Sequence, residues 1–136
     1  MISDALARSL RDAGLRWDPA PGDQFRIEAT ALSEEVFILS HMVIEPRTYE
    51  TGTVLNFNGT TEWALDNIDQ DDALWLPRED QLRDLLGGTF QRMERIESGY
   101  RVSTAEPDGR ARDFTDVVAE DAYARALLHL VHEATD

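Results

Sequence analysis

The chain has 136 residues with no Lys and no Cys, and its formal net charge is -14 because 13 Arg oppose 27 Asp and Glu. Without Lys there is no P-loop, kinase lysine or pyridoxal Schiff base, and without Cys there is no thiolate nucleophile, disulfide or Cys-ligated metal. An acidic surface also repels phosphate groups, so nucleic acids and anionic membranes are poor partners.

The length of the chain suits one ordinary domain, and we expect a single α+β domain over residues 1–136. Its first residues lack the basic region and apolar run of a signal peptide. No apolar stretch approaches the roughly 18 residues of a membrane span. We therefore expect a cytoplasmic protein with no membrane partner, and its oligomeric state stays open.

The first predicted element is a helix over residues 2–13, with Ser3 as the N-cap and Gly14 just beyond its end. A Pro-rich loop at 17–23 then leads to a strand at 25–28. The residues expected on the inward face of the helix are Ile2, Ala5, Leu6, Ser9, Leu10 and Ala13.

Strands and a short helix are predicted for the middle of the chain. The apolar runs 36–39 and 42–44 predict a central strand that is covered on both faces and closed by Pro46. Residues 49–57 are the expected partner of that strand. A short helix at 60–68 follows, with its apolar side turned inward.

The clearest topological signal is a three-stranded meander. Its strands are predicted at 90–97, 100–105 and 110–114, and the turns between them at 98–99 and 107–109 contain Gly. Turns this short join antiparallel neighbours.

One helix is predicted before the meander in the sequence and another after it. After Pro77, the residues Leu82, Leu85 and Leu86 predict a helix with one buried side, stopped by Gly87. The strongest helical pattern covers 117–134. The fold class is therefore α+β, an antiparallel sheet of N-terminal strands plus the meander, packed against about four helices. The inward residues of the last helix are Val117, Tyr123, Ala124, Leu127, Leu128, Leu130, Val131 and Ala134.

Histidines near the C-terminus invite a metal interpretation, since His129, His132 and Glu133 lie on one helix. However, His129 also belongs to a row of residues spaced four apart that begins with Asp121 and Arg125, which we interpret as a solvated ladder of alternating charge. No third and fourth ligand is identifiable, so we expect no metal site.

Two other groups of residues do not fit the spacing or the geometry of a known type of site. Asp66, Asp69, Asp71 and Asp72 fail the spacing of a calcium loop, so we interpret them as part of an exposed acidic loop. Ser40 and His41 are neighbours on a predicted strand. Such neighbours point to opposite faces and cannot act as a nucleophile and its base.

Trp63 and Trp75 flank the acidic loop that contains Asp69, Asp71 and Asp72. These five residues are our candidate partner-binding site, an aromatic patch rimmed by carboxylates that suits a cationic or aromatic partner. The alternative is that both tryptophans are core anchors of the elements on which they sit.

Three segments carry a resemblance: NFNGTTEWALD at 56–66, ALWLPREDQL at 73–82 and AYARALLHL at 122–130. In these segments the chain resembles a family of small uncharacterised actinobacterial proteins, some of which carry the label pilus assembly protein CpaE. Proteins with that label are ParA-like P-loop ATPases, which need a lysine to contact phosphate, and this sequence has no Lys. The second half is loosely similar to small phage-type proteins with the order helix, meander, helix. Neither resemblance implies a catalytic residue.

The sequence contains no recognisable catalytic motif. We therefore expect a non-enzymatic, cytoplasmic, acidic module that binds a protein partner, without a cofactor. Two alternatives stay open. One is a small carboxylate- or His-dependent enzyme with an unrecognised pocket. The other is an acidic mimic of nucleic acid that occupies a basic partner.

Overall fold

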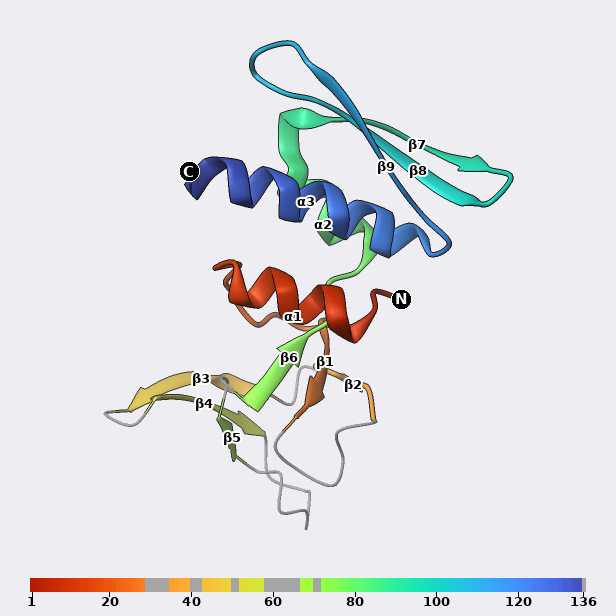
Figure 1. The fold of residues 1–136 in the computed structure, drawn as a ribbon. Coiled ribbons are helices and arrows are strands. Elements are labelled where there is room, and N and C mark those ends of the chain that lie inside the picture. The colour runs from red at the N-terminus through yellow and green to blue at the C-terminus, as the bar shows by residue number, and fades with distance from the viewer. Residues whose placement is uncertain (29–34, 40–42, 50–51, 58–66, 70–71, 136) are drawn as a thin grey trace. The chain divides into compact units, whose positions relative to one another are not determined.

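The computed structural model describes residues 1–28, 35–39, 43–49, 52–57, 67–69 and 72–135. They form two compact units, one from Met1–Arg16 with Leu76–Asp136 and the other from Trp17–Trp75 (Figure 1). The described parts contain three α-helices and three three-stranded antiparallel sheets, which confirms the α+β class. None of the described helices is long and apolar enough to cross a bilayer. The single-domain organisation stays a prediction.

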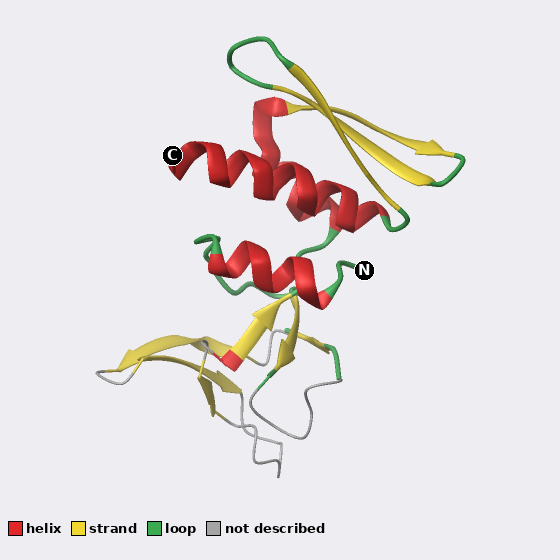
Figure 2. Ribbon diagram, viewed as in Figure 1, coloured by secondary structure: helices red, strands yellow, loops and turns green. Residues whose placement is uncertain are grey.

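The unit that contains both ends of the described chain is built around its last helix. In Figure 2 this helix, α3, runs along one face of the sheet β7-β8-β9, and α1 packs against α3 on the side away from the sheet. The meander is present as predicted. The elements of this unit are α1 (Asp4–Asp12), α2 (Glu79–Leu86), η2 (Gly87–Thr89), β7 (Phe90–Ile96), β8 (Gly99–Ala105), β9 (Ala111–Asp116) and α3 (Ala119–Thr135).

Helix α3 supplies the centre of this unit's core. Tyr123, Ala124 and Leu127 are buried, as the helical pattern predicts. The small side chains of Ala122 and Ala126 are buried as well, so neighbouring elements approach the helix closely. The prediction for Val117 was wrong: it is 74% exposed, because it lies in the connection before the helix begins.

Helix α2 follows its prediction except on one flank. Its start is fixed by the Arg78 N–H, which donates to the Gln81 side chain at 2.9 Å. Leu82 and Leu86 are buried, whereas Leu85 is 40% exposed and was wrongly assigned to the buried side. A helix this short buries only the stripe that faces α3.

Helix α1 begins as predicted, because the Ser3 hydroxyl accepts a hydrogen bond from the Leu6 N–H at 3.2 Å. Its buried stripe differs from the predicted face. Ala7 and Leu10 are buried, while Ala5 and Ser9, both expected to face inward, are exposed. Ala occurs both in protein cores and on surfaces, so the positions of the Ala residues do not show which face of the helix is buried.

The second unit contains two sheets. In the first, β1 (Gln24–Ile27) is the central strand between β2 (Phe37–Ile38) and β6 (Ala73–Trp75). The apolar run at 36–39 was therefore wrongly predicted to be a central strand, since β2 is a two-residue edge strand. A short apolar run has no periodicity that could reveal its place in a sheet.

The second sheet has the order β3 (Val43–Tyr49), β4 (Gly52–Phe57), β5 (Asn67–Asp69). Pro46 does not end the strand as predicted but lies within β3, where the register shifts between Ile44 and Arg47. An edge strand tolerates Pro at such an irregularity. Most of the helix expected at 60–68 lies outside the described residues, and its last two residues belong to β5.

One glycine is required by a close approach of backbone. Gly99 has φ +144°, and a Cβ there would collide with the Asp116 carbonyl oxygen and lie 2.7 Å from Val117 Cα. We expect Gly99→Ala to lower the free energy of unfolding by about 3 kcal/mol, from backbone strain and overpacking. Gly109→Ala is the matched control, because φ is +87° there but no atom lies within 4 Å, and it should cost about 1 kcal/mol. Urea denaturation measures both, and equal losses would contradict the expectation.

Candidate functional site

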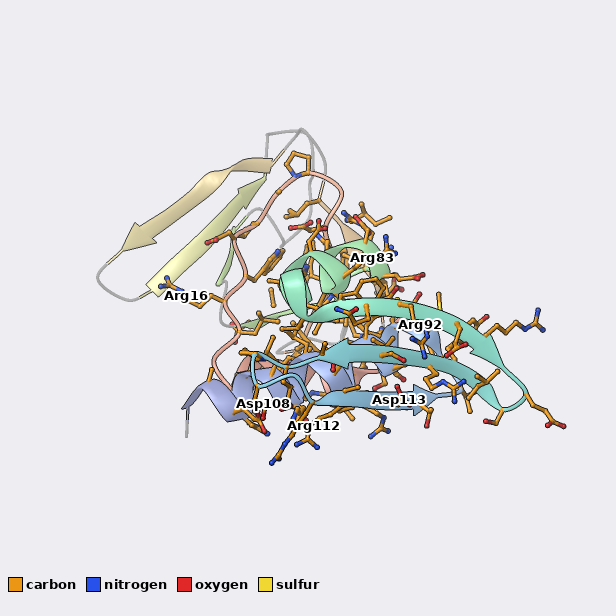
Figure 3. All side chains as sticks on the ribbon, turned by 90° about the horizontal axis from the view of Figure 1, so that it is seen from above. Arg16, Arg83, Arg92, Asp108, Arg112 and Asp113 are labelled. Atoms are coloured by element: carbon orange, nitrogen blue, oxygen red, sulfur yellow. The ribbon has the colours of Figure 1, made fainter. Side chains whose placement is uncertain are left out.

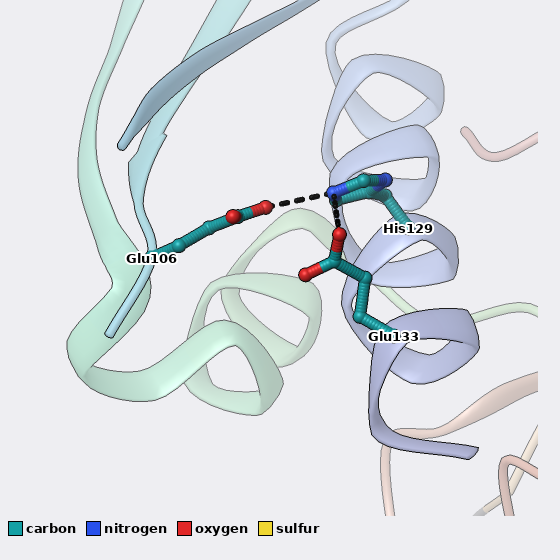
Figure 4. A group of neighbouring side chains, drawn as sticks. All are labelled: Glu106, His129 and Glu133. Atoms are coloured by element: carbon teal, nitrogen blue, oxygen red, sulfur yellow. Dashed lines mark hydrogen bonds and ion pairs between the residues drawn. The ribbon is translucent and has the colours of Figure 1, made fainter. Parts of the chain in front are cut away.

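Three side chains from two separate segments meet at one end of the sheet β7-β8-β9. Glu106 directly follows β8, and His129 and Glu133 lie one turn apart on α3. The His129 Nε2 lies 2.8 Å from the Glu106 Oε1 and 3.3 Å from the Glu133 Oε1 (Figure 4). Because a carboxylate only accepts hydrogen bonds, Nε2 carries the proton in this arrangement and donates it to Glu106. We call Glu106, His129 and Glu133 the C-terminal cluster.

A fourth residue holds the cluster from the sheet side. The Arg112 Nε, on β9, donates to the same Glu106 Oε1 at 2.7 Å. The Glu106 side chain is only 8% exposed, and its pKa lies below its usual range because of the hydrogen bond from His129, with Arg112 adding to the effect against the opposing effect of burial. The carboxylate of Glu106 is thus kept ionised in a nearly enclosed position.

The imidazole of His129 is half-buried, with 30% of the side chain exposed. Its ring lies 5.5 Å from the ring of Phe114, which faces α3 from β9. The interpretation of His129 as part of a solvated ladder was therefore wrong. This row runs along the side of α3 that meets β9 and the chain start. Its first three members, Asp121, Arg125 and His129, have hydrogen-bond partners outside the helix.

Sequence reasoning missed Glu106 and Arg112. The signal available was indirect: Glu106 precedes the predicted turn at 107–109, and Arg112 follows it on the same face as Phe114. That pattern places both residues at the end of a hairpin. It does not say that α3 brings His129 to the same end.

The face of the sheet β7-β8-β9 that is turned away from α3 is polar and carries both Arg and carboxylate side chains. Arg101 and Arg92 both pair with Glu94, at 2.9 and 3.4 Å, and the Ser103 hydroxyl donates to Asp113 at 2.7 Å. The hydrogen bond from Arg101 lowers the pKa of Glu94. Figure 3, which looks onto this face, shows Arg92 and Asp113 over the strands. Mixed charges of this kind do not form a run of carboxylates.

The structure covers the predicted partner-binding site only in part. Trp63 and Asp71 lie outside the described residues, as do Ser40 and His41. Asp69 ends β5 in one sheet, whereas Trp75 ends β6 in the other. Asp72 is exposed beside β6, and its carbonyl accepts a hydrogen bond from the Glu28 N–H. The role of these residues in partner binding stays a prediction.

Trp75 itself is half-buried and belongs to an aromatic core. Its ring stacks on Trp17 with centroids 6.4 Å apart, and Trp17 in turn contacts Phe25. The Trp17 indole N–H donates to the buried Asp23 carboxylate at 2.8 Å. The Trp75 indole N–H is buried and finds no hydrogen-bond partner among the residues that the structure describes. Trp75 therefore acts as a core anchor in this unit.

No family model matches the chain, and no curated protein or solved structure matches it either. The chemistry of the C-terminal cluster is therefore argued from its own residues. The resemblance to small actinobacterial proteins stays a prediction.

The two stacked tryptophans give a matched test of the indole hydrogen bond. Trp17→Phe leaves the carboxylate of Asp23, which is 2% exposed, without its indole donor. Trp75→Phe removes an N–H that is already unpaired among the described residues. We expect Trp17→Phe to lower the free energy of unfolding by about 1–3 kcal/mol more than Trp75→Phe. Equal losses in chemical denaturation would show that the hydrogen bond contributes nothing.

An ion pair between β9 and α3 predicts a dependence of stability on pH. Asp116, 18% exposed, accepts from the Arg125 Nε at 2.8 Å and from the Val118 N–H at 3.3 Å. Burial raises the pKa of Asp116, but these hydrogen bonds outweigh it, so the pKa lies below its usual value near 3.8. The folded state therefore favours the charged form. Its contribution is complete above that usual value and is lost as pH falls through the lower pKa of the folded state.

We expect Asp116→Asn to destabilise the protein by about 1–2 kcal/mol at pH 7 and by progressively less below about pH 4. Urea denaturation of both proteins from pH 7 to pH 3 measures the difference. A difference that stays constant over this range would mean that Asp116 is not stabilised as a carboxylate.

Proposed function

We propose that this chain is a non-enzymatic, cytoplasmic module that binds a protein partner through its acidic surface. The observation that carries the proposal is the distribution of its arginines. Among the described residues, at least eight of the 13 Arg form ion pairs with the chain's own carboxylates. They are Arg11, Arg78, Arg83, Arg92, Arg101, Arg110, Arg112 and Arg125.

The carboxylates outnumber these arginines, so many have no cation beside them. Five of them are exposed and pair with no other described residue: Asp18, Glu35, Asp72, Asp84 and Glu97. Uncompensated carboxylates raise the local negative potential, which attracts a basic protein surface and speeds its association. A basic partner supplies the cations that the chain itself lacks.

The candidate patch of Trp63, Trp75, Asp69, Asp71 and Asp72 belongs to this proposal. Asp72 supports it because its side chain is exposed. Trp75 contributes mainly to the core, so the aromatic contact to a partner falls to Trp63. The resemblance to small actinobacterial proteins, which rests on the three segments at 56–66, 73–82 and 122–130, is part of this proposal.

One observation favours a second candidate, a His-dependent enzyme. The Glu106 carboxylate accepts a hydrogen bond from His129 and orients its imidazole, as the carboxylate of a catalytic triad orients the histidine that acts as general base. The polar face of the sheet β7-β8-β9 alternates Arg with carboxylates, so that face does not support an acidic mimic of nucleic acid.

The test uses a variant in which Asp18, Glu35, Asp72, Asp84 and Glu97 become amides. Partners are captured from cells on the wild type and on the variant, identified, purified and titrated against both by calorimetry. We expect the affinity of a basic partner to fall at least tenfold in the variant, and the wild-type affinity to fall steeply with added salt.

The control replaces the exposed neutral residues Gln91, Ser98 and Thr115 by Ala, which alters the surface without changing its charge. This variant should bind as the wild type does. Trp63→Ala forms a further arm, and a loss of affinity there would assign the aromatic contact. Partners that bind the wild type and the amide variant equally would contradict the proposal.

A further inference from the structure

We propose that the C-terminal cluster binds a divalent transition-metal ion such as Zn²⁺, through the Glu106 carboxylate, the His129 Nε2 and the Glu133 carboxylate. One ligand atom from each residue lies within 4.8 Å of the other two. Ligands at about 2.0–2.2 Å from a tetrahedral ion are about 3.3–3.6 Å apart. The separation of 3.3 Å between His129 Nε2 and Glu133 lies at the lower end of that range, and the separation of 2.8 Å between Nε2 and Glu106 lies below it, so the side chains must move apart by several tenths of an ångström to admit an ion.

The donor set suits such an ion. Imidazole nitrogen together with carboxylate oxygen is a ligand combination for Zn²⁺ and neighbouring first-row metals, whereas Ca²⁺ prefers oxygen alone. His129 and Glu133 are one turn apart on α3, so the helix presents both on one side. Three protein ligands leave a fourth position for water, as in zinc sites that are open to solvent.

Neighbouring side chains hold two of the three ligands in place. Arg112 holds the Glu106 carboxylate, and the ring of Phe114 lies against the imidazole of His129. Hydrogen bonds and packing of this kind fix the orientation of metal ligands. Arg112 also limits the charge: with neutral His129, the two carboxylates and this guanidinium sum to one negative charge, which a divalent ion reverses.

Glu106 has one carboxylate oxygen available to a ligand. Both hydrogen bonds to its side chain, from Arg112 and His129, reach Oε1. Oε2 accepts none from the residues that the structure describes and is not among the buried atoms that lack a partner, so an ion can reach it from solvent. Rotation about the last side-chain bond exchanges the two oxygens, so Arg112 can keep one while the ion takes the other.

Binding puts the ion where the Nε2 proton lies. Nε2 donates to Glu106 in the structure, so the neutral imidazole changes tautomer when it coordinates the metal: Nε2 gives its proton to solvent and Nδ1 takes one up, with no net release. The metal then bridges His129 and Glu106, which are linked in the structure by a hydrogen bond. The proposal does not depend on partner binding, because the amide variant of the exposed carboxylates leaves all three ligands intact.

The full chain, free of any affinity tag and treated with chelator, is titrated with Co²⁺ and followed by visible absorption, and with Zn²⁺ by calorimetry. We expect one ion per chain and the visible bands of tetrahedral Co²⁺. His129→Gln and Glu133→Gln should each weaken Zn²⁺ binding at least tenfold. Glu133 is exposed near the end of α3, so its replacement leaves the fold intact, which circular dichroism checks.

The matched control is His132→Gln, which removes an exposed histidine from the same helix and should leave the affinity unchanged. Three outcomes would overturn the proposal: no saturable binding by the wild type, equal binding by the wild type and Glu133→Gln, or a loss in His132→Gln as large as in His129→Gln. None of them bears on the capture experiment with the amide variant.

Discussion

The burial of α3 is the constraint on which the unit around it depends. The helix contacts α1, α2, β8 and β9, so its first half is enclosed on most sides. Tyr123 and Leu127 fill the larger spaces and each stabilises the fold by about 2 kcal/mol, while Ala122 and Ala126 let neighbouring backbones approach. Asp121, also buried, is accommodated because it accepts a hydrogen bond from the Ser3 N–H at 2.7 Å.

This enclosure decides where the charged groups of α3 can lie. Arg125 and His129 occupy the side that meets β9, where carboxylates of Asp116 and Glu106 receive them. The helix therefore touches the sheet through an apolar contact along its centre and through ion pairs along one border. The acidic surplus is left on other surfaces, where the solvent screens it.

The elements that sequence predicted well are those fixed by neighbouring residues. The turns at Gly99 and Gly109 define the meander, and the apolar stripe of α3 defines its buried side. Contacts between distant segments decided the rest. The strand β1 became central because β6 pairs with it from far along the chain, and no local pattern announces that pairing.

The candidate site shows the same division. His129 and Glu133 were recognisable from their spacing on one helix, whereas Glu106 was not, because only the packing of the hairpin against α3 brings it there. The opposite error occurred at Leu85 and Val117. Their apolar character predicted burial, but a short helix and a connecting segment leave such residues in solvent.

The junction between β9 and α3 has a geometric consequence for the evolution of the chain. Only Val117 and Val118 join the two elements, and Asp116 is held on both sides, with its carbonyl against Gly99 and its carboxylate on Arg125. One inserted residue would turn the whole helix by about 100° about its axis, since an α-helix has 3.6 residues per turn. Tyr123 would then leave the core. We therefore expect related sequences to keep the length of this junction and to accept insertions or deletions in other parts of the chain.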